Sequence, residues 1–226
     1  ANVNPVKALT SGKFTVNDIG KTVYLSNSVT SCQEWRIADI NHDNTSGTVD
    51  LFPKYVLENN RRAFVSNDQI GTDTCAVYSY SLLRKWLNND FYNGFADSIK
   101  ASIKIQEIIS SPIGLLSETL HDKVKCPSVT EVGIEYGSYT SVEGKVYPIF
   151  GSIQNGGNGN LLSAYNTVSG NDAAYWTRST FSHYKNSDIS VIAGKTGCIG
   201  SGSLYNGYYG FIEDSNKFYT IAVIRF

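Results

Sequence analysis

The stretch Trp86-Leu87-Asn88-Asn89-Asp90-Phe91-Tyr92-Asn93-Gly94-Phe95 closes the clearest helix in the sequence, which is predicted over residues 81–95. Apolar residues at spacings of three and four form one stripe, as in a helix with one buried face: Leu82, Leu83, Trp86, Leu87 and Phe91. Polar residues are expected to face away from the stripe: Arg84, Lys85, Asn88 and Asn89. Either Ser79 or Ser81 can cap the start of the helix, and Asn93-Gly94 can end it.

Strands are predicted on both sides of this helix. Residues 22–25 form a short predicted strand, and residues 35–40 and 48–52 alternate as a half-buried β-hairpin with a long turn does. After the helix, strands are predicted at residues 175–179 and 189–193. The strongly apolar run 218–226 is predicted to pair inside a sheet.

Two shorter helices are predicted between these strands. Asp97 can cap one that carries Ile99 and Ile103 and then leads into a strand. Ser128-Val129-Thr130-Glu131 fits a capping box, so a second short helix is predicted to begin there and stop near Gly133. Residues 151–172 are rich in Gly, Asn and Ser and predict a long surface loop, not an interdomain linker.

Length and charge favour one domain that binds neither nucleic acid nor a membrane. The chain has 226 residues and a formal net charge of −1, so no basic field attracts phosphate. No apolar run approaches the length of a membrane span. The N-terminus has neither a basic start nor an apolar stretch, so we expect no secretory signal.

The residues that usually carry chemistry do not form a known motif. The cysteines form no C-x-x-C pair, and the histidines have no metal-ligand spacing: Cys32, Cys75, Cys126, Cys198, His42, His121 and His183. Buried free thiols are expected, and one or two disulfides remain open if the protein lies outside cells. The Asn41–Asp50 turn lacks the glycine position and the closing Glu of a calcium loop. The sequence thus predicts no catalytic residue, metal or cofactor.

Large aromatic and arginine side chains have structural and binding interpretations. Trp35, Trp86 and Trp176 sit in predicted regular elements with apolar neighbours, so core packing is favoured over sugar stacking. Arg36 and Arg178 are expected to fix loops by hydrogen bonds to carbonyls or carboxylates.

Ligand binding is predicted at polar and aromatic residues of loops: Tyr205, Asn206, Tyr208, Tyr209, His183, Tyr184, Asn158 and Asn160. Tyr offers a large contact area at low rotamer cost, and loops on a rigid scaffold are common recognition sites. Such surfaces suit glycans and protein epitopes. An equal alternative is that these residues belong to ordinary hairpin turns with Tyr on the strand face.

The order of these pieces resembles a domain family of unknown function found in bacterial and phage proteins. The resemblance covers residues 16–226 and depends on six segments: Ile19-Gly20-Lys21-Thr22-Val23, Glu34-Trp35-Arg36-Ile37, residues 86–95, Pro127-Ser128-Val129-Thr130-Glu131-Val132, Trp176-Thr177-Arg178-Ser179 and the closing strand. The family usually ends near an Arg-Pro, whereas this chain has Val223-Ile224-Arg225-Phe226.

That family resembles the C-type-lectin-like fold of formylglycine-generating enzymes and phage tropism determinants. The resemblance implies an α+β domain with a twisted antiparallel sheet, two main helices and long irregular loops. The enzymes of this group use a close pair of reactive cysteines. Cys198 has no cysteine near it in the sequence, so this chemistry is not expected.

The function implied is that of a phage virion accessory protein rather than an enzyme. It would be a fibre, collar, tail or capsid appendage that binds a bacterial surface glycan or protein, with other virion proteins as partners and a homo-oligomeric state in the assembly. Residues 1–15 would form an arm that docks the single domain, residues 16–226, onto the particle. The alternatives are a bacterial secreted or cell-surface carbohydrate- or protein-binding module and, third, an enzyme related to the formylglycine-generating group.

Overall fold

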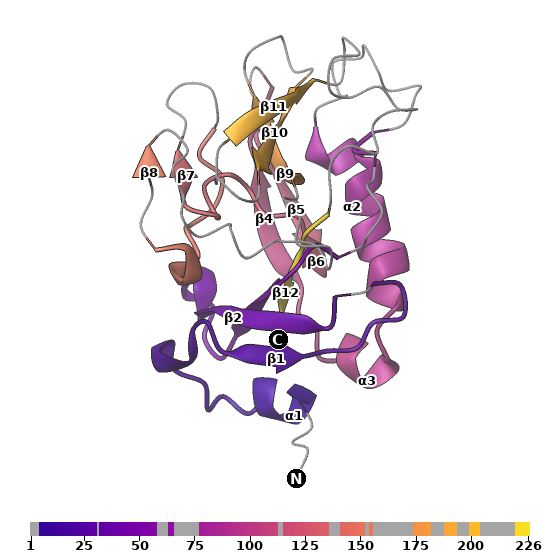
Figure 1. Ribbon diagram of the computed structural model, residues 1–226, viewed down its shortest axis with the longest axis vertical. Coiled ribbons are helices and arrows are strands. Elements are labelled where there is room, and N and C mark those ends of the chain that lie inside the picture. The colour runs from indigo at the N-terminus through magenta and orange to yellow at the C-terminus, as the bar shows by residue number, and fades with distance from the viewer. Residues whose placement is uncertain are drawn as a thin grey trace.

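The protein was examined as a computed structural model that describes residues 5–30, 32–57, 63–65, 77–112, 115–135, 141–151, 154–155, 174–181, 188–193, 199–203 and 220–226. Within them the chain is a mixed α and β protein with mainly antiparallel sheets and few helices. Figure 1 shows β1 and β2 near one end of the molecule, β9 to β11 near the other and α2 along one side.

A five-stranded sheet forms the centre of the fold, in the order β1 (Thr22–Tyr24), β2 (Glu34–Ile40), β3 (Val49–Pro53), β12 (Val223–Arg225) and β6 (Val124–Lys125). β12 lies between β3 and β6 and is antiparallel to both. The prediction that the apolar run at residues 218–226 pairs inside a sheet is therefore confirmed, although the strand itself is shorter.

The half-buried character predicted for the β2–β3 hairpin is wrong for β3, whereas the first part of β2 alternates as predicted, with Trp35 and Ile37 buried and Arg36 intermediate. All five residues of β3 are buried, because apolar clusters cover both faces of the sheet. Trp35 and Leu51 belong to one cluster, and Ala38 and Phe52 belong to the other. The antiparallel pairing of the two strands is as predicted.

The predicted helix is present as α2 (Leu82–Trp86), continued by a π-helical turn at Leu87–Phe91. Ser81 caps it, since its Oγ accepts a hydrogen bond from the Arg84 amide at 3.0 Å. Leu82 is exposed, which corrects the predicted stripe. Neighbouring helical residues are about 100° apart, and Leu83 takes the core-facing direction.

Two of the polar residues expected to face away from the core instead connect this helix to the segment before and within β6. Arg84 forms a bidentate ion pair with Asp122, with nitrogen–oxygen distances of 2.8 Å from Nε and 2.7 Å from the second nitrogen. The Asn88 amide bonds the backbone of Lys123 and Val124, accepting at 3.0 and 3.1 Å and donating to the Val124 carbonyl at 2.8 Å. The Asn88 side chain thereby forms the hydrogen bonds to this backbone that a neighbouring strand would otherwise form.

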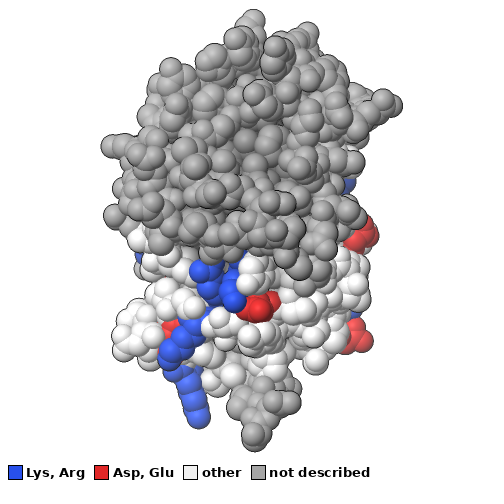
Figure 2. Space-filling view, viewed as in Figure 1, with Lys and Arg blue, Asp and Glu red and all other residues white. Residues whose placement is uncertain are grey.

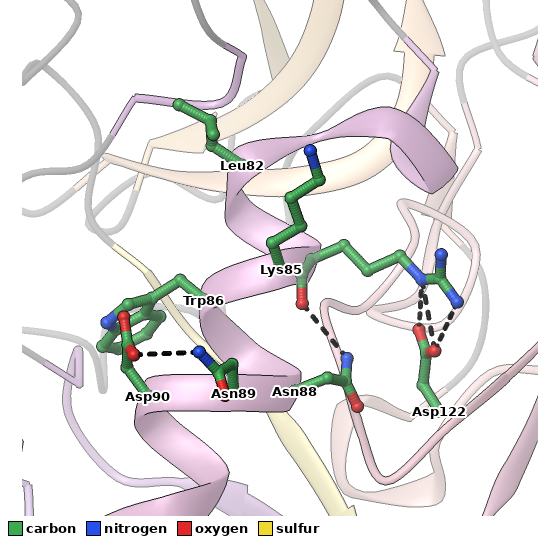
Figure 3. Close-up of a pocket in the computed structure, with 8 residues that line it drawn as sticks. Leu82, Lys85, Trp86, Asn88, Asn89, Asp90 and Asp122 are labelled. Carbon is green, nitrogen blue, oxygen red and sulfur yellow. Dashed lines mark hydrogen bonds and ion pairs between the residues drawn. The ribbon is translucent and has the colours of Figure 1, made fainter.

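Asn88→Ala is expected to lower the free energy of unfolding by about 1–3 kcal/mol, because it leaves partly buried backbone groups unpaired. Asn89→Ala is the matched control, since Asn89 is exposed and its amide bonds only nearby side chains. Its cost should stay within about 0.5 kcal/mol. Urea unfolding measures both, and equal costs for the two variants would contradict this role of Asn88. Figure 3 shows Asn88 on the Asp122 side of the helix.

Both shorter helices differ from their predictions. The first is one turn, α3 (Asp97–Lys100), and its N-cap is Ala96; Asp97 instead pairs with Lys100. At the second, Ser128 and Glu131 exchange both capping-box hydrogen bonds at 3.0 Å. The chain nevertheless makes only a turn there, because Gly133 takes a φ of 79° and leads into β7 (Ile134–Glu135).

The remaining elements surround this centre. α1 (Pro5–Leu9) covers the core with buried Leu9, so this part of the predicted arm packs on the domain. The β4 (Gln106–Ser110) and β5 (Glu118–Asp122) strands form an antiparallel hairpin, and β7 pairs in parallel with β8 (Gln154–Asn155). No helix within the described ranges is long and apolar enough to span a bilayer.

A separate three-stranded antiparallel sheet has the order β11 (Ile199–Ser203), β10 (Asp188–Ala193) and β9 (Ala174–Phe181). Asp188 pairs with Phe181 on one side and with Ser203 on the other. These three residues therefore lie at the same end of the sheet. The strands predicted at residues 175–179 and 189–193 are both confirmed.

Candidate functional site

The predicted ligand-binding residues all lie outside the described residues: Tyr205, Asn206, Tyr208, Tyr209, His183, Tyr184, Asn158 and Asn160. Their binding role stays a prediction. The β-sheet register nevertheless relates two of the segments. His183 follows Phe181 in the sequence, and Tyr205 follows Ser203. Phe181 and Ser203 lie at the same end of the β9–β11 sheet.

The three tryptophans and Arg178 have the structural roles that the sequence predicts. Trp35 and Trp176 are fully buried, and Trp86 is nearly so. The Arg178 guanidinium donates to the Cys126 carbonyl at 2.9 Å and to the carboxylate of Glu131. Cys32 and Cys126 are buried free thiols, as expected, while Cys75 and Cys198 fall outside the described residues. Burial raises the pKa of the Cys126 thiol.

The first group of charged residues, here called the Glu131 cluster, consists of Lys125, Glu131, Glu143 and Arg178, and all four are buried. The Glu131 carboxylate accepts from Lys125 Nζ at 2.7 Å and from both terminal nitrogens of Arg178 at 2.6 and 3.0 Å. Burial opposes ionisation of Glu131, but the two cations outweigh it and hold the pKa of its carboxyl far below the usual range. The cluster joins the capping-box turn to β9 and β6.

Glu143 completes this cluster from the segment 141–151. Its carboxylate accepts from Ser179 Oγ at 2.6 Å and from the Ser111 amide at 2.7 Å. Burial raises the pKa of this carboxyl, and nearby Glu131 acts in the same direction, although Arg178 opposes both. Glu143 therefore connects β9 to the end of the β4–β5 hairpin at the cost of holding a carboxylate away from water.

Glu143→Gln is expected to become more stable relative to the native chain as the pH rises. A raised pKa means that the contribution of Glu143 to stability is full below the ordinary value of 4.5 and is lost as the pH rises through the folded-state pKa. Gln does not titrate and can still accept from Ser111. Urea unfolding at pH 4.5 and pH 8 measures the difference. Thr119→Ala is the control, because Thr119 is exposed and has no ionisable group, so its difference should not change with pH. A Glu143→Gln difference that falls with pH would contradict the assignment.

The second group, here called the Asp50 cluster, consists of Asp43, Asp50, Tyr147, His42 and Arg225. Asp50 accepts from Arg225 at 2.6 and 2.7 Å and from the Tyr147 hydroxyl at 3.0 Å. The His42 ring stacks on Tyr147 with centroids 3.9 Å apart. Asp43 adds a weaker contact to Arg225 at 3.4 Å. Lys125 Nζ lies 5.3 Å from the centre of the Tyr147 ring and so brings the two clusters together.

The turn that carries Asp43 is strained. Asn41, Asp43 and Asn44 have φ values of 59°, 54° and 61°, in the left-handed region. Asn and Asp tolerate this region better than other non-glycine residues, and such strain gathers at functional sites. The turn borders a hollow into which both clusters open, with Asp43, Glu131, Arg178 and Arg225 among its lining residues.

A second hollow, of about 720 Å³, follows the surface of α2 (Figure 3). Figure 3 shows Trp86 and Asp90 on one side of the helix and Asn88 and Asp122 on the other. Arg84, Asn88 and Asp122 are already joined to one another or to the backbone. These contacts hold the helix in place, so this hollow is the weaker candidate for a ligand site.

The described surface has no simple charge pattern in the view of Figure 2. Basic side chains gather at one place beside an acidic group, and most of the other described atoms in this view are uncharged. This mixture agrees with the net charge of −1.

Residues 47–225 match a family described as a domain of unknown function (DUF6273). The chain belongs to the DUF6273 family. The predicted membership in a family of unknown function is thus confirmed. The part that matches the DUF6273 family includes both charge clusters except His42 and Asp43, and it leaves α1, β1 and β2 outside. No curated protein and no solved structure matches this chain.

The charge clusters were missed by the sequence interpretation. Arg225 stands between Ile224 and Phe226, and Asp50 stands between Val49 and Leu51. A charged residue inside an apolar strand is a signal for a buried partner, because an unpaired charge there would be very costly. That signal could have predicted two buried charges, but not which residues pair with them.

Proposed function

We propose that this DUF6273 chain is a ligand-recognition module with a C-type-lectin-like fold, carried on a phage virion as a fibre, collar, tail or capsid appendage. Its ligand would be a glycan or protein of the bacterial surface. The order of motifs, the Tyr- and Asn-rich segments and the near-neutral charge support this proposal.

The observation that carries the proposal is the shared end of the β9–β11 sheet. Phe181, Asp188 and Ser203 lie together there. The segments that follow Phe181 and Ser203 contain the predicted contacts His183, Tyr184 and Tyr205. Recognition residues that start from one end of a sheet can contribute to one surface.

The second support is the way this sheet is fixed. Arg178 of β9 is held by Glu131, and Ser179 of β9 is held by Glu143. A buried ion pair and a buried hydrogen bond therefore attach β9 to the Glu131 cluster. A rigid base lowers the entropy that connecting segments lose when they bind a ligand.

Binding of the labelled full chain to intact bacteria of the source culture tests the recognition role. The Tyr205→Ala/Tyr208→Ala double variant should lose most of this binding, because aromatic anchors dominate such contacts. Tyr24→Ala is the control, since Tyr24 is an exposed tyrosine on β1. If the folded native chain bound no bacterial surface, the recognition role would be wrong. Equal binding by the double variant would overturn the choice of residues.

Mass spectrometry of gradient-purified virus particles tests the virion assignment. Peptides of this chain at a fixed copy number are expected. If the chain is found in the secreted or cell-wall fraction and not in particles, the protein is the alternative, a bacterial surface-binding module.

A further inference from the structure

Exposed apolar side chains gather at the β4–β5 hairpin. Five of the ten large hydrophobic side chains that are exposed in the described part of the chain lie just before this hairpin, within it or in the segment 141–151: Ile105, Ile109, Leu115, Leu116 and Val142. Leu116 is 92% exposed, the highest value among the ten. One exposed apolar residue is ordinary, but several close together mark a contact surface.

The β-sheet pleat and register place the strand residues on one face. Glu107 and Ile109 are exposed, whereas the residues of β4 on either side of each of them are buried, since alternate residues of a strand point to opposite faces. On β5, His121 pairs with Glu107 and Thr119 pairs with Ile109, and both are exposed. Ile105 lines the same hollow as Glu107 and Ile109, so it belongs to this face too.

The hairpin loop adjoins the end of this face. The hydroxyls of Ser111 and Ser117 lie 2.9 Å apart at the base of the loop that carries Leu115 and Leu116. The Ser111 amide also donates to the Glu143 carboxylate at 2.7 Å, which brings the exposed side chain next to Glu143, that of residue 142, close to the same loop. The strand residues and this loop are here called the outer hairpin face.

The charges of the outer hairpin face are few and complementary to each other. Of the outward-facing residues of β4 and β5, Glu107 and His121 carry the titratable groups, and the carboxylate lies 3.9 Å from the imidazole Nε2. The acidic side chains that line the hollow beside this face are already held by arginines. A partner with charge of one sign therefore finds little to pair with, whereas a surface with the same acid and imidazole can pair with both.

A two-fold axis parallel to the strands makes this face complementary to itself. Such an axis lays β4 of one copy over β5 of the other, so each cross-strand pair covers the same pair in reverse order. Glu107 then meets His121 of the second copy, Ile109 meets Thr119 of the second copy, and the two hairpin loops lie side by side. An axis that crosses the strands at Glu107 would instead bring two carboxylates together.

We propose that the outer hairpin face is the contact surface for a second copy of this chain, which packs on it about an axis parallel to β4 and β5. One face of a two-stranded hairpin is smaller than the roughly 800 Å² per partner of a standard interface, so the dimer is weak, with a Kd on the order of 10 µM. Two ligand-recognition modules joined in this way would bind a surface with several ligands more tightly than one module does.

Sedimentation equilibrium of the full chain tests the dimer, over concentrations from about 1 to about 500 µM on both sides of the expected Kd. Leu116→Ser should raise the Kd about tenfold or more, because it removes apolar contact from both copies. It should leave the folded chain intact, since Leu116 is 92% exposed. Val16→Ser is the matched control: Val16 is 69% exposed in the short 3₁₀ helix Val16–Asp18, away from the hairpin, and its Kd should stay within about twofold.

Exchange of the charges tests the direction of the axis. Glu107→Lys leaves two lysines in the contact without a carboxylate, and His121→Glu brings four carboxylates together, so each variant alone should remain a monomer. An equimolar mixture of the two variants should associate again, because each introduced lysine then meets an introduced glutamate of the other copy. Both positions are exposed, so neither change disturbs the core.

Three results would overturn this pairing: a monomer at every concentration, a dimer that Leu116→Ser leaves unchanged, or a mixture of the charge variants that associates no better than each variant alone. A monomer would show that no second copy covers the face. The pairing and the proposed function fail separately. A monomeric chain that binds bacteria would leave the recognition role in place, and a dimer that binds no bacterial surface would leave the pairing in place.

Discussion

Glu131→Gln is expected to lower the free energy of unfolding by about 3–5 kcal/mol, the cost of breaking a buried ion pair from one side. Glu131 is the common partner of Lys125 and Arg178, both of which are buried. Gln keeps the shape but not the charge, so two cations would stay in the interior with only Glu143 near them. Urea unfolding at pH 7 gives the value.

A second substitution shows whether stranded charge is the cause. In the Glu131→Gln/Lys125→Met double variant one uncompensated cation is gone, so part of the lost stability should return. Glu107→Gln, at an exposed position, should change the stability by less than about 0.5 kcal/mol. The contrary result is that the double variant loses as much free energy of unfolding as Glu131→Gln and Lys125→Met lose together when measured singly. The loss would then come from packing and not from charge.

Asp50→Asn is expected to cost about 3 kcal/mol, because it removes the charge that compensates Arg225 inside the central sheet. Asp50 is fully buried and bonds Arg225 through both carboxylate oxygens, while Tyr147 donates to the same group. The register places Asp50 directly opposite Arg225, so the pair joins β3 to β12. Thermal and urea unfolding should agree on the loss.

Asp43→Asn is the matched control for this pair. Asp43 contacts the same arginine at 3.4 Å, but its side chain is 38% exposed. Exposed ion pairs contribute less than about 1 kcal/mol, and Asn tolerates the left-handed φ of this position. A larger loss for Asp43→Asn than for Asp50→Asn would show that the strained turn, and not the buried carboxylate, compensates Arg225.

Local patterns in the sequence predicted the elements that local rules control. The apolar stripe of Leu82, Leu83, Trp86, Leu87 and Phe91 predicted the helix, although Leu82 proves exposed, and Ser81 caps it. The hydrogen bonds between Ser128 and Glu131 are those of a capping box. The helix predicted from the same motif does not form, because Gly133 takes a left-handed φ and leads into β7.

Long-range pairing was beyond the sequence interpretation. The partner of Asp50 is Arg225, which is 175 positions away, and the partner of Glu131 is Arg178, 47 positions away. A single sequence shows that these residues are charged and sit in apolar runs, but it does not show which ones meet. Members of both pairs line the same hollow beside the 41–48 turn, and this could be recognised only in three dimensions.

The place of β12 between β3 and β6 has a consequence for synthesis on the ribosome. β3 is completed early, but its neighbour in the sheet is made only with residues 223–225. At about 5–20 residues per second, β3 waits on the order of ten seconds with an unpaired apolar edge. Such an edge invites pairing with other chains. We therefore expect the nascent chain to depend on chaperones during this interval and the released chain to fold slowly, as high contact order requires.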